Sequence, residues 1–180
     1  LAEAYSEMLD WDALEETRRR FNELAIAHQG TLVLGKCDPF TAMCSSVSPD
    51  IIKLTAESHC RKVRYYSPKV DFKYRMPLDG KLKIGYLSPD FSKHAVGFLL
   101  NDIFALHDRN EFEIYGYLLR NEFDEYTQTI QNSCDHFENL SRLSHADAAA
   151  KINSDGINIL VDLVGHTAYS RVQIAALRPA

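Results

Sequence analysis

The sequence predicts an α/β fold in which a helical segment precedes a Rossmann-like parallel sheet. From about residue 81 onward, short apolar strands alternate with amphipathic helices, an order that gives a parallel sheet with helices on both faces. Before this part, apolar residues recur at helical spacing. Between the two parts, residues 65–80 contain two prolines and mixed polarity, which is typical of a linker.

We therefore expect two units, a helical segment at 1–68 and an α/β unit at 69–180. In the first unit, residues 1–28 have helical periodicity, while residues 30–48 are rich in Gly, Pro, Ser and Thr and are expected to be mostly connection. Residues 48–63 begin with Ser-Pro-Asp, which supplies an N-cap, a proline at the first helical position and an acidic first turn. These residues therefore predict a helix.

The second unit contains four strands and four helices in alternation. The expected strands cover residues 81–88, 111–119, 136–140 and 157–165. The expected helices cover residues 94–107, 123–134, 144–156 and 170–178. The last strand, INILVDLVG, is almost continuously apolar, which predicts a central strand buried on both faces.

Composition and charge exclude several classes of protein. The net charge of −5 argues against a nucleic-acid binder, and no apolar run approaches the ~20 residues of a membrane span. The sequence has no CxxC, HxxxH or HExxH pattern, so we expect no protein-held metal. We expect its four cysteines to be free thiols in a reducing cytoplasm.

The two ends of the chain resemble internal sequence. The chain starts at Leu1 within a helical pattern and stops at Ala180, just after an apolar helix-like stretch. We therefore expect this chain to be part of a longer polypeptide.

Two turns at the carboxyl ends of strands carry the candidate site residues. The first strand is followed by SPDFSKHAVG, which contains His94 and Gly97 and lacks the GxGxxG pattern of a dinucleotide clamp. The fourth strand runs into DLVGHT, which contains Asp162, Gly165 and His166. Ligands of open α/β sheets bind at this edge, so the two turns are the candidate site.

The histidines of these turns suit proton chemistry. A helix N-terminus disfavours an imidazolium and keeps His94 neutral, as a base or as a hydrogen-bond donor. His166 has the same chemistry, and Gly97 and Gly165 allow close approach of a substrate. The competing interpretation is structural: His94 caps a helix, and Asp90 and Asp162 only cap helices or fix their turns.

Several stretches of the sequence resemble a known family. KLKIGYLSPDFSKHAVGFLL, DGINILVDLVGHT and ALRPA resemble the start of the catalytic region of the O-linked N-acetylglucosamine transferases and SPINDLY-type proteins, glycosyltransferase family 41. Upstream, LDWDALEETRRRF and PFTAMCSSVSPDIIKLTAESH are similar to the family's helical connector, which follows tetratricopeptide repeats. The resemblance covers nearly the whole chain, and DFxxH, GHT and the terminal RPA are specific in combination.

The resemblance implies a two-lobed GT-B enzyme, of which this chain is the connector and the first lobe. The implied reaction is inverting, needs no metal or cofactor, and moves N-acetylglucosamine from UDP-GlcNAc to Ser or Thr hydroxyls of proteins. The second lobe, absent from this chain, mainly holds the nucleotide-sugar, so the chain alone is expected to be inactive. The implied catalytic residues are His94, His166 and Asp162, and the implied substrate-binding residues are Gly165, Thr167 and Gly97.

Three alternatives stay open on the sequence alone. Within the family, the donor is alternatively GDP-fucose or UDP-glucose. A different class of function is a non-catalytic protein-binding or scaffolding module. An unrelated sugar-nucleotide epimerase or flavodoxin-like domain requires a phosphate-binding turn after the first strand, where SPDFSKH offers no glycine.

Overall fold

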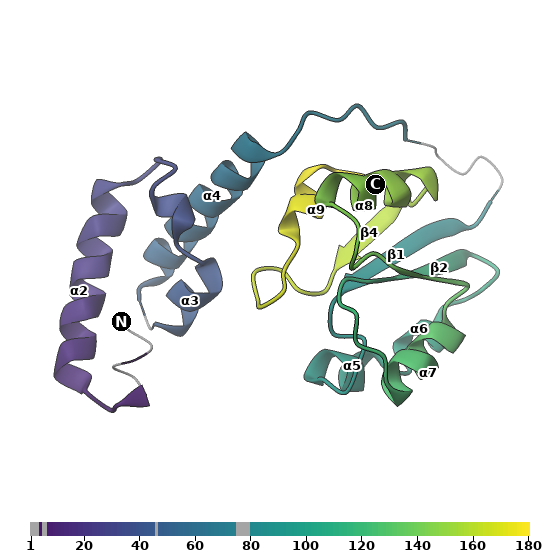
Figure 1. Ribbon diagram of the computed structural model, residues 1–180, viewed down its shortest axis with the longest axis horizontal. Helices are drawn as coiled ribbons and strands as arrows, with labels where there is room; N and C mark the ends of the chain where they lie inside the picture. The colour runs from purple at the N-terminus through teal and green to yellow at the C-terminus, as the bar shows by residue number, and fades with distance from the viewer. Residues whose placement is uncertain (1–3, 5–6, 46, 75–79) are drawn as a thin grey trace. The chain divides into compact units, whose positions relative to one another are not determined.

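The computed structural model describes residues 4, 7–45, 47–74 and 80–180. The chain forms two compact units, which comprise residues 1–66 and 67–180 (Figure 1). Among the described residues, no helix is both long enough and apolar enough to cross a membrane.

The first unit is helical. Its elements are α2 (Trp11–Ala27), the 3-10 turn η1 (Leu34–Lys36), α3 (Pro39–Cys44) and α4 (Pro49–Tyr66). The expectation that residues 30–48 are mostly connection is correct only in part, because η1 and α3 lie within them. Asp38 accepts a hydrogen bond from the Thr41 backbone N–H at 2.9 Å, and Pro39 occupies the first helical position. A strong N-cap followed by proline therefore starts a helix within a turn-rich segment.

The second unit contains a four-stranded parallel sheet, as predicted. Its strands are β1 (Leu82–Ser88), β2 (Phe112–Leu118), β3 (His136–Asn139) and β4 (Ile159–Asp162), in the order β3-β2-β1-β4. Leu87 of β1 is in register with Asp162 of β4, and Ser88 is in register with Leu118 of β2. The carboxyl ends of three neighbouring strands therefore meet at one edge.

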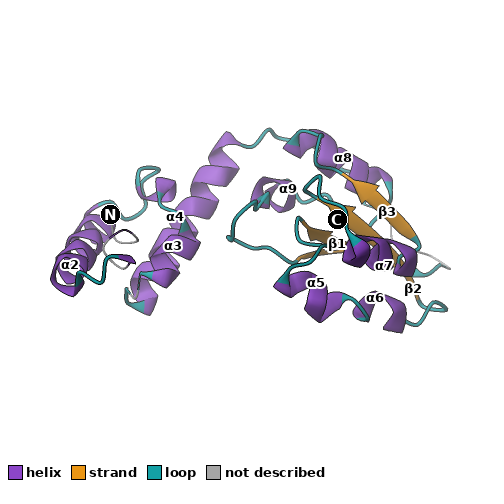
Figure 2. Cartoon of the chain, turned by 60° about the horizontal axis from the view of Figure 1, so that its bottom comes forward, coloured by secondary structure: helices purple, strands orange, loops and turns teal. Residues whose placement is uncertain are grey.

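Helices cover both faces of this sheet, which also confirms the prediction (Figure 2). Its helices are α5 (Ala95–Leu100), α6 (Ile103–Leu106), α7 (Glu125–Ser133), α8 (His145–Ser154) and α9 (Val172–Ala176). On the face of α5, α6 and α7, the core contains Phe91, Phe104, Ile114 and Ile130. On the face of α8 and α9, it contains Tyr117, Leu140, Ile152 and Ile174.

The single helix expected at 94–107 is interrupted. The Asn101 side chain donates to Asp102 Oδ1 at 3.1 Å between α5 and α6. Both residue types are poor helix formers because their side chains compete for backbone hydrogen bonds. The break lets Phe104 point into the core, where it is fully buried, while Leu99 is 77% exposed.

The expectation that β4 is a central strand buried on both faces is not met in the part of the chain that the structure describes. Within the described part of the chain, β4 pairs with β1 and forms an edge of the sheet. Ile159 is 45% exposed. The other three residues of β4 are half-buried, so the strand is not buried on both faces in the described part of the chain. An apolar run also carries no information on how many neighbours a strand has.

A polar network fixes α8 on the sheet. The Lys83 ammonium donates to the Tyr115 hydroxyl and to the Asp155 carbonyl, both at 3.0 Å. The Asp155 carboxylate accepts from the Tyr117 hydroxyl at 2.8 Å and from Lys151 Nζ at 2.7 Å. Burial, followed by the hydrogen bond with Asp155, raises the pKa of Tyr117. The network therefore joins β1, β2 and α8 through satisfied polar groups.

All four cysteines are free. Cys134 follows α7 and packs against the α5–α7 face of the core. Burial raises the pKa of its thiol to about 12. Cys44, at the end of α3, is exposed.

Candidate active site

Three turns meet at the carboxyl edge of the sheet. They follow β1, β2 and β4, and β1 lies between the other two strands. The Leu119 N–H donates to the Ser88 carbonyl at 2.9 Å, and the Leu163 N–H donates to the Leu87 carbonyl at 3.1 Å. These bonds attach the segments after β2 and β4 to the end of β1. Both histidine turns therefore lie at the edge where open α/β sheets bind ligands.

His94 is the N-cap residue of α5. Its backbone is extended, and its Nδ1 accepts a hydrogen bond from the Val96 N–H at 3.2 Å. Because this bond uses the Nδ1 lone pair, a neutral imidazole in this arrangement carries its proton on Nε2. The side chain is 50% exposed. The cap role and a catalytic role therefore involve different nitrogens of one ring.

Asp90 joins the candidate site, although the sequence indicated only a turn or capping role. Its Oδ2 atom lies 3.7 Å from His94 Nδ1, and its side chain is 13% exposed. The distance exceeds a hydrogen bond, but the nearly buried carboxylate favours a positive or proton-donating neighbour. The signal in the sequence was the spacing of four residues within DFxxH.

Gly97 is required by the turn itself. A Cβ atom at this position would lie 2.0 Å from the Ser92 carbonyl oxygen, and Gly97 is buried. The same carbonyl accepts from the His94 N–H at 2.6 Å. The close approach at Gly97 is thus between α5 and its own preceding turn, which fixes the backbone of His94.

The turn after β4 is held by its own polar side chains. Asp162 Oδ1 accepts from the backbone N–H groups of Val164 at 2.9 Å and Gly165 at 3.3 Å. The Thr167 hydroxyl donates to the Val164 carbonyl at 3.1 Å. Gly165 has φ +59°, and His166 is half-buried. Asp162 thus has the turn-fixing role that the sequence left as its alternative.

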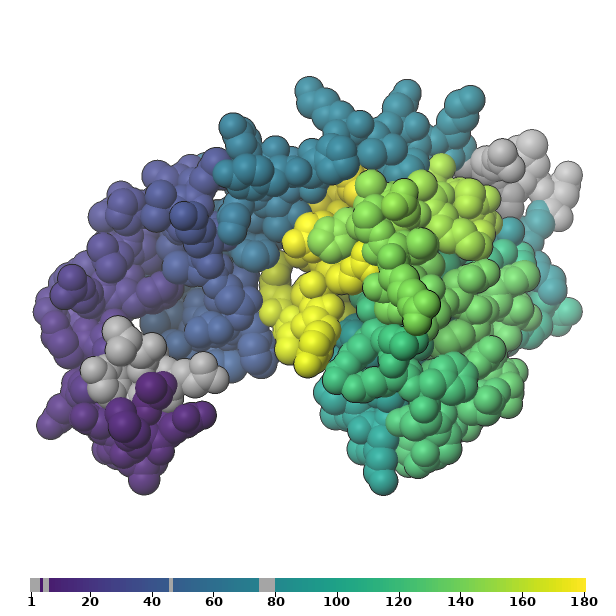
Figure 3. All heavy atoms as spheres, in the orientation of Figure 1, coloured from purple at the N-terminus to yellow at the C-terminus, as the bar shows by residue number. Residues whose placement is uncertain are grey.

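Arg120 and Tyr169 form a contact that the sequence did not indicate. The Arg120 guanidinium carbon lies 4.3 Å from the centre of the Tyr169 ring, a cation–π geometry. The first residue follows β2 and the second follows β4, so the contact joins two of the three turns. The loop that carries Tyr169 stands out at the surface (Figure 3). No sequence pattern relates an arginine after one strand to a tyrosine after another.

Asp124 connects the His94 turn to α7. Its Oδ2 atom accepts from the Lys93 N–H at 2.6 Å, and its Oδ1 atom accepts from the N–H groups of Tyr126 and Thr127, both at 3.0 Å. Burial alone raises the pKa of Asp124, but the hydrogen bonds from Thr127 and Lys93 outweigh it, so this pKa lies below its ordinary value of 3.8. The carboxylate therefore stabilises the folded chain.

We expect Asp124→Ala to lower the free energy of unfolding by about 1–2 kcal/mol at neutral pH, the usual effect of losing an N-cap. Because the folded-state pKa is lowered, this contribution is present above pH 3.8 and is lost as the pH falls through the folded-state value. Urea titrations of both proteins at neutral and acidic pH measure this. Asp102→Ala is the control, since the Asp102 carboxylate accepts from the Asn101 side chain but makes no cap hydrogen bond with a backbone N–H. An equal loss of unfolding free energy at every pH would contradict a lowered folded-state pKa of Asp124.

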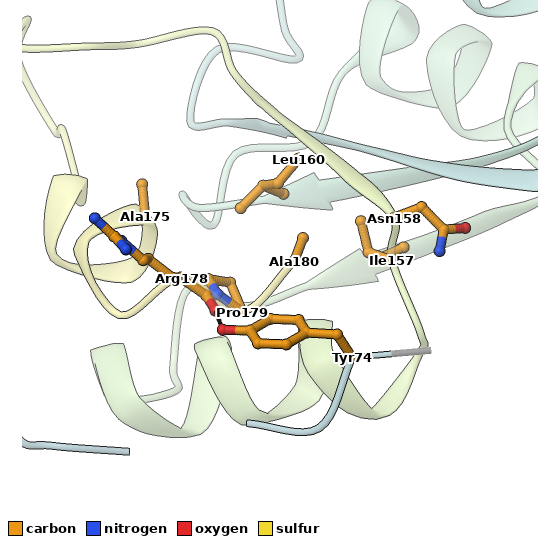
Figure 4. A pocket seen from close by; sticks show the side chains of 8 residues that line it. All are labelled: Tyr74, Ile157, Asn158, Leu160, Ala175, Arg178, Pro179 and Ala180. Atoms are coloured by element: carbon orange, nitrogen blue, oxygen red, sulfur yellow. Dashed lines mark hydrogen bonds between the residues drawn. The ribbon is translucent and has the colours of Figure 1, made fainter. Parts of the chain in front are cut away.

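A cavity of about 600 Å³ lies elsewhere in the second unit (Figure 4). Its lining includes Ile157 and Asn158, which precede β4, and Tyr74, whose hydroxyl donates to the Arg178 carbonyl at 2.8 Å. It therefore borders the amino end of β4, away from the three turns. Across the described ranges, no group of three or more His, Cys, Asp or Glu side chains is arranged to hold a metal ion.

Several known proteins are similar to this chain in sequence. The chain is 39% identical over 102 residues to the UDP-N-acetylglucosamine–peptide N-acetylglucosaminyltransferase of Caenorhabditis elegans, covering 56% of this chain and 9% of that protein. It is 34% identical over 160 residues to an Arabidopsis thaliana protein named "Probable UDP-N-acetylglucosamine--peptide N-acetylglucosaminyltransferase SEC", covering 82% of this chain and 16% of the relative. The chain thus spans a small part of the length of these relatives.

The fold agrees with a solved structure. A mutant O-GlcNAc transferase of Thermobaculum terrenum superposes with a TM-score of 0.61 at 27% identity, covering 91% of this chain and 29% of that one. The family description "Glycosyl transferase family 41" matches residues 8–180. Together with the two turns at the carboxyl edge, this match shows that the chain belongs to glycosyl transferase family 41.

Proposed function

We propose that the full-length protein is a glycosyltransferase that moves N-acetylglucosamine from UDP-GlcNAc to Ser or Thr hydroxyls of proteins. In this proposal residues 1–68 form a helical connector after tetratricopeptide repeats, and residues 69–180 form the first lobe of a GT-B enzyme in the cytoplasm. The observation that carries it is the position of His94 on the carboxyl edge of a parallel sheet in a family 41 chain.

The proposed reaction is a direct displacement with inversion. The acceptor oxygen bonds to the anomeric carbon, the bond from that carbon to the diphosphate oxygen breaks, and UDP leaves with the electron pair. The acceptor proton must pass to a base, and the leaving diphosphate needs hydrogen-bond donors or cations. This chain offers candidates for the first task, and we assign the second mainly to another lobe.

The geometry of His94 gives it two possible roles in this displacement. With Nδ1 accepting from Val96, the ring offers an Nε2–H donor, which can orient a hydroxyl or a sugar oxygen. To accept a proton at Nε2, the ring must carry its own proton on Nδ1. Asp90 then becomes the partner of Nδ1, since its carboxylate lies 3.7 Å away. A small movement of the ring, after which Nδ1 contacts the Asp90 carboxylate instead of the Val96 N–H, converts the donor into a base.

We assign supporting roles to the turn after β4. Asp162 holds this turn through two backbone N–H groups and is in register with Leu87 of β1, which supports a position for His166 and Thr167 near the end of β1. Among the described residues, no atom lies within 4 Å of the position of a Cβ on Gly165, which leaves space for a substrate group. In this proposal Asp162 acts by holding the shape of the turn, and Gly165, His166 and Thr167 border the substrate.

The test uses the full-length protein with an acceptor protein and each of three donors, UDP-GlcNAc, GDP-fucose and UDP-glucose. We expect UDP-GlcNAc to support transfer, with a β-linked product identified by mass spectrometry and NMR, and an unchanged rate in EDTA. The 180-residue chain alone is expected to show no turnover. Transfer from another donor would change the assigned substrate, and absence of transfer with all three would favour a scaffolding function.

A further inference from the structure

Tyr169 has a backbone conformation that needs an explanation. Its φ is +61°, in the left-handed region that side chains with a Cβ rarely adopt. The side chain is 62% exposed, so burial does little to stabilise this conformation. The two other described non-glycine residues with positive φ, Leu9 and Arg178, lie outside the three turns. Strained residues that persist at a ligand edge commonly have a functional reason.

The contact that holds Tyr169 comes from Arg120. A guanidinium stacks on an aromatic ring through its planar face, and the separation of 4.3 Å is well within the range of this attraction. Arg120 also forms an ion pair with Glu122, and it directly follows Leu119, whose N–H is bonded to the end of β1. The guanidinium is therefore presented from a fixed segment.

The loop that carries Tyr169 is also attached at its two ends. At its start, the Leu163 N–H bonds to β1, and at its end the Arg171 guanidinium donates to the carbonyls of Leu140 and Leu143, both at 2.8 Å. Between these points, Ser170 donates through its hydroxyl to the Gly165 carbonyl and through its N–H to the Thr167 carbonyl, so the loop closes on itself. The Tyr169 ring adds an attachment to the turn after β2.

We propose that Arg120 and Tyr169 form a clasp that positions residues 165–167 beside the His94 turn. Both are positioning residues, and the clasp crosses the end of β1 because β1 lies between β2 and β4. The strain at Tyr169 places its ring against Arg120. The effect of the clasp on sugar transfer rests on the proposed function, whereas its effect on loop order does not.

The first test measures loop order in the 180-residue chain. The reporters are the amides of Thr167 and Ser170, which are hydrogen-bonded within the loop. We expect Arg120→Ala and Tyr169→Gly to speed the hydrogen exchange of these amides about 2–5-fold. This factor corresponds to the free energy of an exposed cation–π interaction, converted at tenfold per 1.4 kcal/mol. Tyr169→Phe keeps the ring and Glu122→Gln keeps the guanidinium, so both should exchange at the wild-type rate.

The stability of the same variants separates a clasp from general destabilisation. Glycine relieves the strain of a positive φ, so Tyr169→Gly is expected to keep the thermal midpoint at or above the wild-type value while its loop exchanges faster. Unchanged exchange in Arg120→Ala and Tyr169→Gly would overturn the proposal. An acceleration in Glu122→Gln equal to that in Arg120→Ala would also overturn it, because the ion pair would then be the cause.

The second test measures transfer by the full-length protein. We expect Arg120→Ala and Tyr169→Gly to lower kcat about 2–5-fold without changing KM for the donor, and Tyr169→Phe to retain the wild-type kcat. Equal kcat in all variants would contradict a positioning role. If the wild-type protein shows no transfer, the proposed function fails, and the exchange measurements still decide whether the clasp exists.

Discussion

His94→Ala in the full-length protein is expected to lower the rate of sugar transfer by about 10²–10⁴-fold, the usual contribution of a general acid–base residue. The expectation rests on the exposed ring at the carboxyl edge of the sheet and on its two alternative partners, Val96 and Asp90. Initial rates with saturating UDP-GlcNAc and acceptor measure the loss. His28→Ala is the matched control, because that histidine lies exposed at the C-cap of α2.

Two further substitutions separate the two roles of His94. His94→Asn keeps an oxygen that can accept from the Val96 N–H, so it retains the cap of α5 and tests whether lost activity reflects lost structure. His94→Gln supplies a side-chain N–H donor but no base near neutral pH. Recovery of transfer in His94→Gln would assign the donor role, and activity as low as that of His94→Ala would assign the base. Wild-type activity in His94→Ala would remove the residue from the mechanism.

Gly97→Ala is expected to destabilise the second unit by about 3 kcal/mol, at the upper end of the usual cost of overpacking. The added methyl would lie 2.0 Å from the Ser92 carbonyl oxygen, a backbone atom that cannot rotate away as a side chain can. Native-state hydrogen exchange of the β1 and β2 amides measures this loss in the 180-residue chain. The same variant should also disturb transfer, since the Ser92 carbonyl accepts from the His94 N–H.

Gly165→Ala is the matched control for this prediction. Its φ of +59° makes alanine strained there, but no atom of the part of the chain that the structure describes lies within 4 Å of the position of a Cβ. We expect a cost of about 1–2 kcal/mol from the backbone alone. Equal destabilisation by the two alanines would mean that the clash at Gly97 is relieved by movement of the turn.

Much of the second unit follows from local sequence. Alternation of apolar runs with capped helices is sufficient for a parallel sheet, and Ser144 caps α8 as a short polar residue before a helix is expected to. The position of β4 within the sheet did not follow, because the number of neighbours of a strand depends on pairing and not on its own pattern. The break between α5 and α6 was missed because Leu99, Ile103 and Leu106 show helical spacing, although Phe104 is the buried residue.

Some residues of the candidate site could likewise be predicted from the sequence, and others could not. Residues that act within one turn were visible in the sequence, as His94 and Asp162 show through their spacing from a strand end. Asp90 was noticed only as a turn residue, because the sequence does not show that its carboxylate is nearly buried beside an imidazole. Arg120 and Tyr169 come from different turns, and only the order of the strands brings them together.

The environment of Cys134 has a consequence for chemical labelling. Thiolates are the species that react with alkylating reagents, and a thiol with a pKa of about 12 is almost entirely protonated in neutral buffer. Cys44, being exposed, meets the reagent first. We therefore expect Cys134, which is half-buried against the α5–α7 face of the core, to be modified more slowly than Cys44 and to react faster when this face opens. This makes the thiol a reporter of transient unfolding on the α7 side of the sheet.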